Sequence, residues 1–281
     1  AEPINREKNL QAILDSPSYL PVEYDSEFLQ QWETRPVRVQ LELLKTENGL
    51  MKEGVESTIV VFGGTQVVEA EEAHARLEAA RQELEASPGD EQTQRLVERL
   101  TRVVAKCQYY DAAREFGKLV SSNCQLDGKC DYVIVTGGGP GIMEAANRGA
   151  YDVGAKSIGL NITLPAEQAP NPYITPELCF QFHYFALRKM HFLMRAKAMV
   201  VFPGGFGTLD ELFDALTLRQ TERMQEIPII LFGQEFWEKV IDFQFLADEG
   251  VIADRDLELI NYAQTPQEAW DIITRFHQQD S

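Results

Sequence analysis

The sequence predicts an α/β protein built on a doubly wound parallel sheet with helices on both faces. Two observations carry this prediction. Apolar segments rich in β-branched residues alternate with helical patterns. Two of these segments end in glycine-rich turns that enter helices, and the first ends in Gly63-Gly64-Thr65. The expected strands are 58–62, 132–136, 157–161, 199–202 and 227–232. Parallel sheets bind ligands at the carboxyl ends of their strands, so the glycine turns predict a site at that edge.

The remaining elements follow in chain order. Residues 1–56 have mixed charge and helical spacing without a strong strand, which predicts a helical extension ahead of one principal domain over 57–281. The charged, alanine-rich stretch 71–106 is broken by Ser87-Pro88-Gly89-Asp90, which predicts an inserted helical hairpin with a solvated or oligomer-facing acidic surface. A helix is expected over 182–199, and Thr265-Pro266 should begin the last helix.

Composition narrows the range of partners. A formal charge of −18 over 281 residues disfavours nucleic-acid binding, which needs a basic surface. The four cysteines form no metal-binding or disulfide pattern and are typical of reduced thiols. Neither a membrane-spanning stretch nor a signal peptide is recognisable, so a cytoplasmic protein without a membrane partner is expected.

The stretch AMVVFPGGFGTLDE at 198–211 predicts a phosphate cradle. Gly204, Gly205 and Gly207 allow a ligand close to the main chain, and the free N–H groups of the following helix favour an anion. Thr208 and Glu211 also have the spacing of a capping box, with Thr208 as N-cap. Glu211 is therefore either a catalytic carboxylate beside the phosphate or a cap.

A second glycine turn, GGGPGIME at 137–144, follows the second strand. The turn does not match the G-x-G-x-x-G motif of dinucleotide-binding proteins, because Ile142 occupies the position of the final glycine. A P-loop is not present either, since no glycine run is followed by Lys and Ser or Thr. With these two binding motifs excluded, a mononucleotide or a sugar phosphate is the favoured ligand. Glu144 either reaches the ligand or only complements the helix dipole.

The expected helix 182–199 carries Arg188, His191 and Arg195 on one face. With Lys189 and Lys197, the arginines either bind a small anion or are ordinary solvated charges. A packing role is favoured for His191.

Three motifs together make the chain similar to the Lonely Guy family of phosphoribohydrolases, often mislabelled lysine decarboxylases. They are GGGPGIMEA at 137–145, LRKMHFLMRAKAMVVFPGG at 187–205 and PGGFGTLDE at 203–211. The resemblance runs from about residue 57 to the end of the sequence. It implies a Rossmann-like fold and a homodimer or higher homo-oligomer, with the site near the subunit interface. No metal and no cofactor, pyridoxal phosphate included, are expected.

The resemblance makes Arg188 and Glu211 the catalytic pair. It also implies substrate contacts from Glu167, Lys189, Gly204, Gly205, Phe206, Gly207, Thr208 and Thr217, although the segment around Glu167 is longer here than in the family. The other glycine turns add Gly63, Gly64, Thr65, Gly138, Gly139, Gly141, Met143 and Glu144 as expected substrate-binding residues. Phe206, Met143 and Met190 are candidates for contacts with the base.

The expected activity is hydrolysis of the N-glycosidic bond of a nucleoside 5′-monophosphate, with AMP or a cytokinin riboside monophosphate as substrate. A non-catalytic nucleotide sensor or carrier is the alternative, because fold does not fix function. Amino-acid decarboxylation would need a pyridoxal-binding lysine, which the sequence does not show. The extension at 1–56 and the hairpin at 71–106 depart from the compact plant enzymes, which leaves the preferred base and the assembly open.

Overall fold

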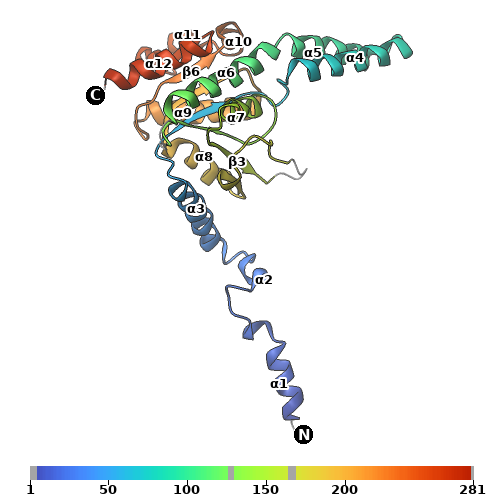
Figure 1. The fold of residues 1–281 in the computed structure, drawn as a ribbon, viewed down its shortest axis with the longest axis vertical. Coiled ribbons are helices and arrows are strands. Elements are labelled where there is room, and N and C mark those ends of the chain that lie inside the picture. The colour runs from blue at the N-terminus through green and yellow to red at the C-terminus, as the bar shows by residue number, and fades with distance from the viewer. Residues whose placement is uncertain (1–4, 126–129, 164–168, 280–281) are drawn as a thin grey trace. The chain divides into compact units, whose positions relative to one another are not determined.

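The computed structural model describes residues 5–125, 130–163 and 169–279, and its centre is a parallel sheet of seven strands (Figure 1). The strands lie in the order β4-β3-β2-β1-β5-β6-β7, and every neighbouring pair is parallel. Their bounds are β1 Thr58–Phe62, β2 Val133–Thr136, β3 Ser157–Ile162, β4 Cys179–Phe182, β5 Ala196–Val201, β6 Ile229–Phe232 and β7 Ile260–Ala263. The direction of strand addition reverses between β1 and β5, the point at which doubly wound sheets bind ligands.

Helices cover both faces of the sheet, which confirms the predicted fold class. The described α-helices are α1 Arg6–Leu14, α2 Ser26–Leu29, α3 Arg35–Lys52, α4 Ala70–Ala86, α5 Glu91–Val104, α6 Cys107–Cys124, α7 Ile142–Asp152, α8 Phe185–Met194, α9 Phe206–Gln220, α10 Gln234–Val240, α11 Phe243–Asp248 and α12 Pro266–Gln279. No helix among them is both long enough and apolar enough to cross a membrane.

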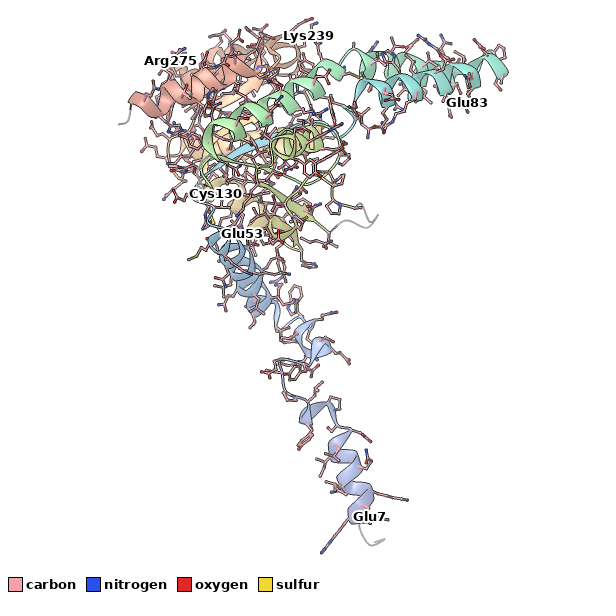
Figure 2. The ribbon with its side chains drawn as sticks, in the orientation of Figure 1. Glu7, Glu53, Glu83, Cys130, Lys239 and Arg275 are labelled. Carbon is pink, nitrogen blue, oxygen red and sulfur yellow. The ribbon has the colours of Figure 1, made fainter. Side chains whose placement is uncertain are left out.

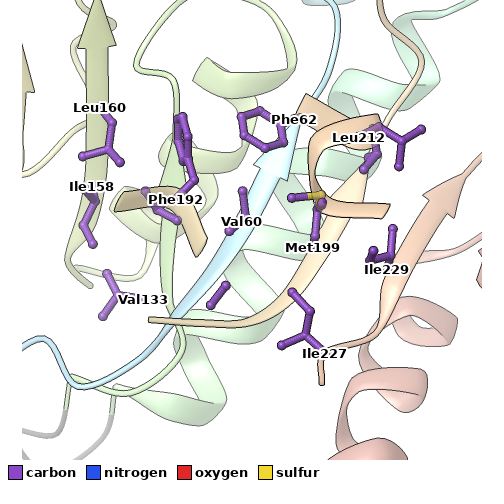
Figure 3. Packing of buried hydrophobic residues seen from close by; sticks show 14 of the residues in the cluster. Val60, Phe62, Val133, Ile158, Leu160, Phe192, Met199, Leu212, Ile227 and Ile229 are labelled. Atoms are coloured by element: carbon purple, nitrogen blue, oxygen red, sulfur yellow. The ribbon is translucent and has the colours of Figure 1, made fainter. Parts of the chain in front are cut away.

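Alternate residues of each strand supply the two cores. On one face, Val60 and Met199 pack against Phe192 of α8 and Leu212 of α9 (Figure 3). On the other face, Ile59 and its neighbours pack against α6, α7 and α12. Burial on both sides explains why the central strands are continuous apolar runs.

Five strands match the predicted segments to within three residues at each end, but β4 and β7 were missed. Both are four-residue strands at opposite edges of the sheet, and Gln181 and Asn261 interrupt their apolar residues. Edge strands need less apolar sequence because they are partly exposed. All four cysteines are free in the structure.

The helix expected over 182–199 is wrong in its second half. α8 ends at Met194, and residues 196–201 form β5 instead. The Arg195 carbonyl accepts a hydrogen bond from the Thr58 N–H at 2.9 Å, so pairing with β1 overrides helical continuation. Arg195 and Lys197 therefore do not share a helical face with Arg188, and the predicted basic face is absent.

The predicted hairpin is present as α4 and α5, which pack against each other and are separated by residues 87–90. Asp90 caps α5 by accepting hydrogen bonds from the N–H groups of Gln92 and Thr93. Figure 2 shows Glu83 of α4 and Lys239 of α10 projecting from the surface. At the end of the chain, the Thr265 hydroxyl accepts from the Glu268 N–H at 3.2 Å, which confirms the predicted cap of α12.

The chain divides into two compact units, residues 1–47 and 48–281. In the first unit, Thr34 is buried and its hydroxyl donates to backbone carbonyls at the end of α2, including that of Leu29 at 2.9 Å. The second unit holds the whole sheet and begins within α3, where Leu50 joins the core. The helical character predicted for the first 56 residues is confirmed for those described.

Candidate functional site

A pocket of about 300 Å³ lies at the carboxyl ends of β1 and β5, where strand addition reverses direction. It is formed by the turn after β1, the start of α7, one side chain of α8 and the first two turns of α9. The lining residues are Phe62, Gly63, Gly64, Thr65, Met143, Arg188, Gly205, Phe206, Gly207, Thr208 and Glu211.

Backbone hydrogen bonds hold the turns around the pocket together. The Gly64 N–H donates to the Pro203 carbonyl at 2.9 Å, and the Ile142 N–H donates to the Gly64 carbonyl at 3.2 Å. Gly141 has a φ of +72°, and a Cβ there would overlap the Gly64 and Thr65 carbonyls. Only glycine therefore lets the α7 turn approach the β1 turn this closely.

The start of α9 differs from the capping-box interpretation, which is wrong. The helix begins at Phe206 with Gly205 as N-cap, and no side chain caps it. Gly205 is an extended residue (φ −102°, ψ −153°) three positions before the expected N-cap, so Thr208 lies inside the helix and Glu211 in its second turn. The first intrahelical bond runs from the Leu209 N–H to the Gly205 carbonyl. The N–H groups of Phe206, Gly207 and Thr208 are thus available to an anion in the pocket.

Glu211 is the buried carboxylate of the pocket, with 8% of its surface exposed. Burial raises its pKa to about 7, against the opposing effect of the positive charges of Lys189 and Arg188. Both protonation states of Glu211 are therefore populated near neutral pH. Such a carboxyl group can accept or donate a proton at physiological pH.

Arg188 reaches the same pocket from α8. Its Nε donates to the Leu160 carbonyl at 2.7 Å, and its guanidinium lies 5.2 Å from the centre of the Phe192 ring. Burial lowers the pKa of Arg188, while the negative charge of Glu211 raises it. The backbone bond fixes the side chain with the rest of its guanidinium free to bind a ligand.

Two asparagines that the sequence did not single out hold the 137–139 turn. Asn171 donates from Nδ2 to the Gly139 carbonyl at 3.1 Å, and its N–H donates to the Gly138 carbonyl at 2.9 Å. Asn147 is fully buried and accepts from Asn171 and from the Thr136 hydroxyl. Asn171 lies between two prolines at 170 and 172, which was the only local indication of a fixed turn.

Of the expected site residues, ten line this pocket: Gly63, Gly64, Thr65, Met143, Arg188, Gly205, Phe206, Gly207, Thr208 and Glu211. Gly138, Gly139, Gly141 and Gly204 lie in the adjoining turns and are not among its lining residues. Glu167 lies outside the described residues. Met190 lines a different hollow, so of the candidates for base contacts only Phe206 and Met143 are at the pocket.

Three expected residues have other partners. The Glu144 carboxylate accepts from the Tyr110 hydroxyl at 2.9 Å, and Lys189 pairs with Asp210 at 2.8 Å. Thr217 donates to the Phe213 carbonyl and lines a separate hollow on α9. His191 is buried on α8, and its Nδ1 lies 2.8 Å from the Leu187 carbonyl of the same helix.

Within the described ranges, no group of three or more His, Cys, Asp or Glu side chains could hold a metal ion. The polar lining of the pocket consists instead of backbone amides, the hydroxyl groups of two threonines, one guanidinium and one carboxylate. This donor set suits an organic anion such as a phosphate ester.

Comparison with known proteins links this pocket to a family. The family described as "possible lysine decarboxylase" matches residues 143–273, a range that includes Arg188, the glycine turn and Glu211. The cytokinin riboside 5′-monophosphate phosphoribohydrolase LOG of rice (Oryza sativa subsp. japonica) is 29% identical over 167 residues, which cover 58% of this chain and 65% of the rice protein. The enzyme LOG3 of Arabidopsis thaliana is 29% identical over 169 residues, covering 58% of this chain and 73% of LOG3. The chain thus spans less than two thirds of the rice protein.

Solved structures with a similar chain path include two proteins named for molybdenum cofactor. The Moco carrier protein of Chlamydomonas reinhardtii is 18% identical, with a TM-score of 0.48 over 80% of this chain and 99% of that one. The molybdenum cofactor binding protein of Rippkaea orientalis is 20% identical, with a TM-score of 0.43 over 60% of this chain and 87% of that one. The family match over residues 143–273 and the plant relatives confirm the resemblance to the Lonely Guy enzymes that the sequence motifs indicate.

Proposed function

We propose that the chain hydrolyses the N-glycosidic bond of a nucleoside 5′-monophosphate, releasing the free base and ribose 5-phosphate. The observation that carries this proposal is the pairing of the buried Glu211 carboxyl group with the uncapped start of α9 in one pocket. An anion site and a carboxyl group with a pKa near 7 are what this reaction needs side by side.

The substrate's 5′-phosphate binds at the start of α9. The N–H groups of Phe206, Gly207 and Thr208 lack intrahelical partners, and the helix dipole favours a negative charge there. Glu211 lies one turn further along the same helix, so the ribose that follows the phosphate lies against its carboxylate. Binding energy from the phosphate thereby positions the bond that breaks.

Cleavage leaves positive charge on the ribose ring in the transition state, as in glycoside hydrolysis. The Glu211 carboxylate stabilises that charge and orients the attacking water. The water's hydroxyl adds to the anomeric carbon, while the bonding electrons and a proton pass to the base nitrogen. Arg188, fixed by its bond to Leu160, holds the substrate or stabilises the negative charge that departs with the base.

The names of the plant relatives support this reaction class, since each is called a phosphoribohydrolase of a cytokinin riboside 5′-monophosphate. AMP and its prenylated derivatives are therefore the first substrates to test. Met143 and Phe206 border the pocket, and Phe206 is 92% exposed, so these side chains are available to contact the base.

The test compares the release of adenine from AMP and from adenosine by the purified chain. The proposal expects turnover of AMP and far less turnover of adenosine, because the nucleoside lacks the group that α9 binds. Comparable hydrolysis of both would contradict the phosphate assignment. Binding of AMP without release of adenine would favour a nucleotide sensor or carrier instead.

A pair of variants separates the chemistry from the fold. Glu211→Gln keeps the shape but removes the charge, so it should bind AMP and lose at least about 100-fold in kcat. Asp210→Asn is the matched control, since Asp210 is a neighbouring acid on α9 that is absent from the pocket lining. Equal losses of kcat in both variants would contradict a catalytic role for Glu211.

A further inference from the structure

A second hollow, of about 370 Å³, lies against the same glycine turns and shares Gly64, Thr65 and Gly205 with the pocket. The inserted hairpin supplies one of its walls. Its lining residues are Gly64, Thr65, Gln66, Val67, Arg99, Arg102, Val103, Lys106, Pro203, Gly204, Gly205 and Phe236. A ligand group there would therefore adjoin an anion held at the start of α9.

The charged residues of this wall are all basic. Arg99, Arg102 and Lys106 are three and four residues apart, so they share one face of α5 and of the turn after it. In the described part of the chain, none of the three forms a salt bridge, and Lys106 donates only to the Arg102 carbonyl. Three cations without acidic partners stand out in a chain with a formal charge of −18.

The position of these cations is set by packing. Val103 and Val104 at the end of α5 pack against the buried cluster of Val68, Ala73 and Cys107. Val68 lies four residues after Gly64, so the same contact ties α5 to the turn that borders the pocket. Glu98, the nearest acid on α5, lines a neighbouring hollow together with Arg95, Arg99 and Arg102, and it is not among the residues that line this one.

We propose that this hollow is a second phosphate-binding subsite, in which Arg99, Arg102 and Lys106 bind a phosphate group beside the one held by α9. The inference rests on the proposed function in one respect, because it takes the first phosphate to lie at α9. The ligand class it assigns is a nucleoside 5′-diphosphate, whose β-phosphate extends past Gly205. A separate phosphate ion bound beside a monophosphate would satisfy the same chemistry.

Calorimetric titration of the full chain tests this subsite without relying on turnover. Pyrophosphate and orthophosphate contain no glycosidic bond, so they are titrated into the unmodified protein. ADP and AMP are titrated into the Glu211→Gln protein, with and without saturating orthophosphate. Pyrophosphate and ADP should bind roughly tenfold or more tightly than orthophosphate and AMP, because each gains contacts with charged groups.

Two double variants assign that difference to the subsite. Arg99→Ala/Arg102→Ala should remove the preference for the second phosphate and leave AMP binding unchanged. Arg81→Ala/Arg95→Ala removes the same charge from the same hairpin at positions that do not line the hollow, and it should keep the preference. If AMP and orthophosphate bind together, and only the first double variant prevents this, the second phosphate is a separate ion.

Equal affinity for ADP and AMP, with no joint binding of AMP and orthophosphate, would overturn the subsite. Equal effects of the two double variants would overturn it as well. These failures are distinct from failure of the proposed function, in which AMP itself would not bind or would release no adenine from the unmodified protein.

Discussion

At the scale of single residues, the site depends on what burial does to Glu211. The carboxyl group is 8% exposed and its pKa is raised to about 7, although Lys189 and Arg188 oppose the shift. The penalty for burying a charge thus exceeds the attraction of two nearby cations. The same penalty makes two measurable properties depend on pH.

The first property is the rate. The proposed mechanism uses the ionised carboxylate, so kcat/KM for AMP should rise as pH increases through about 7 and then level off. Initial rates of adenine release from about pH 5 to about pH 9 measure this. A rate that stays flat over that range, or falls through about pH 7, would show that the ionised form of Glu211 is not required.

The second property is stability. The pKa of Glu211 is raised in the folded protein above its ordinary value of 4.5, so the stabilisation that comes from protonating the buried carboxyl group is complete below that value and is lost as pH rises through about 7. Glu211→Gln removes the buried charge and should raise the free energy of unfolding at about pH 8 by on the order of 3 kcal/mol.

Urea denaturation of both proteins measures this difference. At about pH 4 the gap should nearly vanish, because the native carboxyl group is then protonated. A variant less stable than the unmodified chain at both pH values would mean that Glu211 makes structural hydrogen bonds.

At the scale of elements, the site is an interlock of turns rather than a set of independent loops. The turn after β1 is bonded both to the turn after β5 and to the start of α7. Gly141 is where two of these turns meet. Replacing it should disturb the pocket even though Gly141 does not line it.

Gly141→Ala and Gly154→Ala test this interlock as a matched pair. Both glycines have positive φ, +72° and +70°, but a Cβ at 154 would meet nothing within 4 Å. Gly141→Ala should therefore cost about 1–3 kcal/mol more stability than Gly154→Ala, because it adds overlap to a similar backbone strain. It should also weaken AMP binding. Thermal unfolding measures the first effect, and equal destabilisation by the two variants would contradict it.

Helices and strands that have a clear apolar or turn pattern could be predicted from the sequence. Element ends that depend on tertiary contacts could not. The buried central strands and the α4–α5 hairpin follow from apolar runs and turn residues. The end of α8 did not follow, because pairing of β5 with β1 decides where that helix stops. The start of α9 was misplaced because Gly205 caps it by backbone conformation, for which Thr208 was the more usual candidate.

For the site, the glycine turns, Arg188 and Glu211 carried local patterns, and the structure brings them to one pocket. Asn147 carried no local pattern and Asn171 only its two flanking prolines, since the importance of both lies in a contact across 24 residues of sequence. The basic face of α5 was missed, because the hairpin was expected to present an acidic surface, although Arg99, Arg102 and Lys106 lie at helical spacing. Its relevance came only from the packing that brings α5 to the glycine turns.

At the scale of the whole molecule, the second unit leaves an apolar face uncovered. Met190 and Met194 of α8 are 40% and 45% exposed and border a hollow of about 570 Å³ together with Leu218 and Met224. Exposed apolar surface of this kind is typical of protein interfaces. We expect a homodimer or a higher homo-oligomer that covers this face.

Light scattering on the purified chain should give at least twice the monomer mass of 31.8 kDa. Met190→Lys/Met194→Lys places two charges on the apolar face and should lower the mass toward that of the monomer. A monomeric unmodified chain, or a double variant of unchanged mass, would contradict an interface at α8.

We propose that this chain is a phosphoribohydrolase in which Glu211 supplies the catalytic charge. The most direct measurement is chromatographic detection of adenine and ribose 5-phosphate after incubation of AMP with the unmodified chain and with Glu211→Gln. We expect equal amounts of the two products from the unmodified chain and almost none from the variant, as the proposed role of Glu211 requires. Intact AMP in both samples, despite measurable binding, would contradict it.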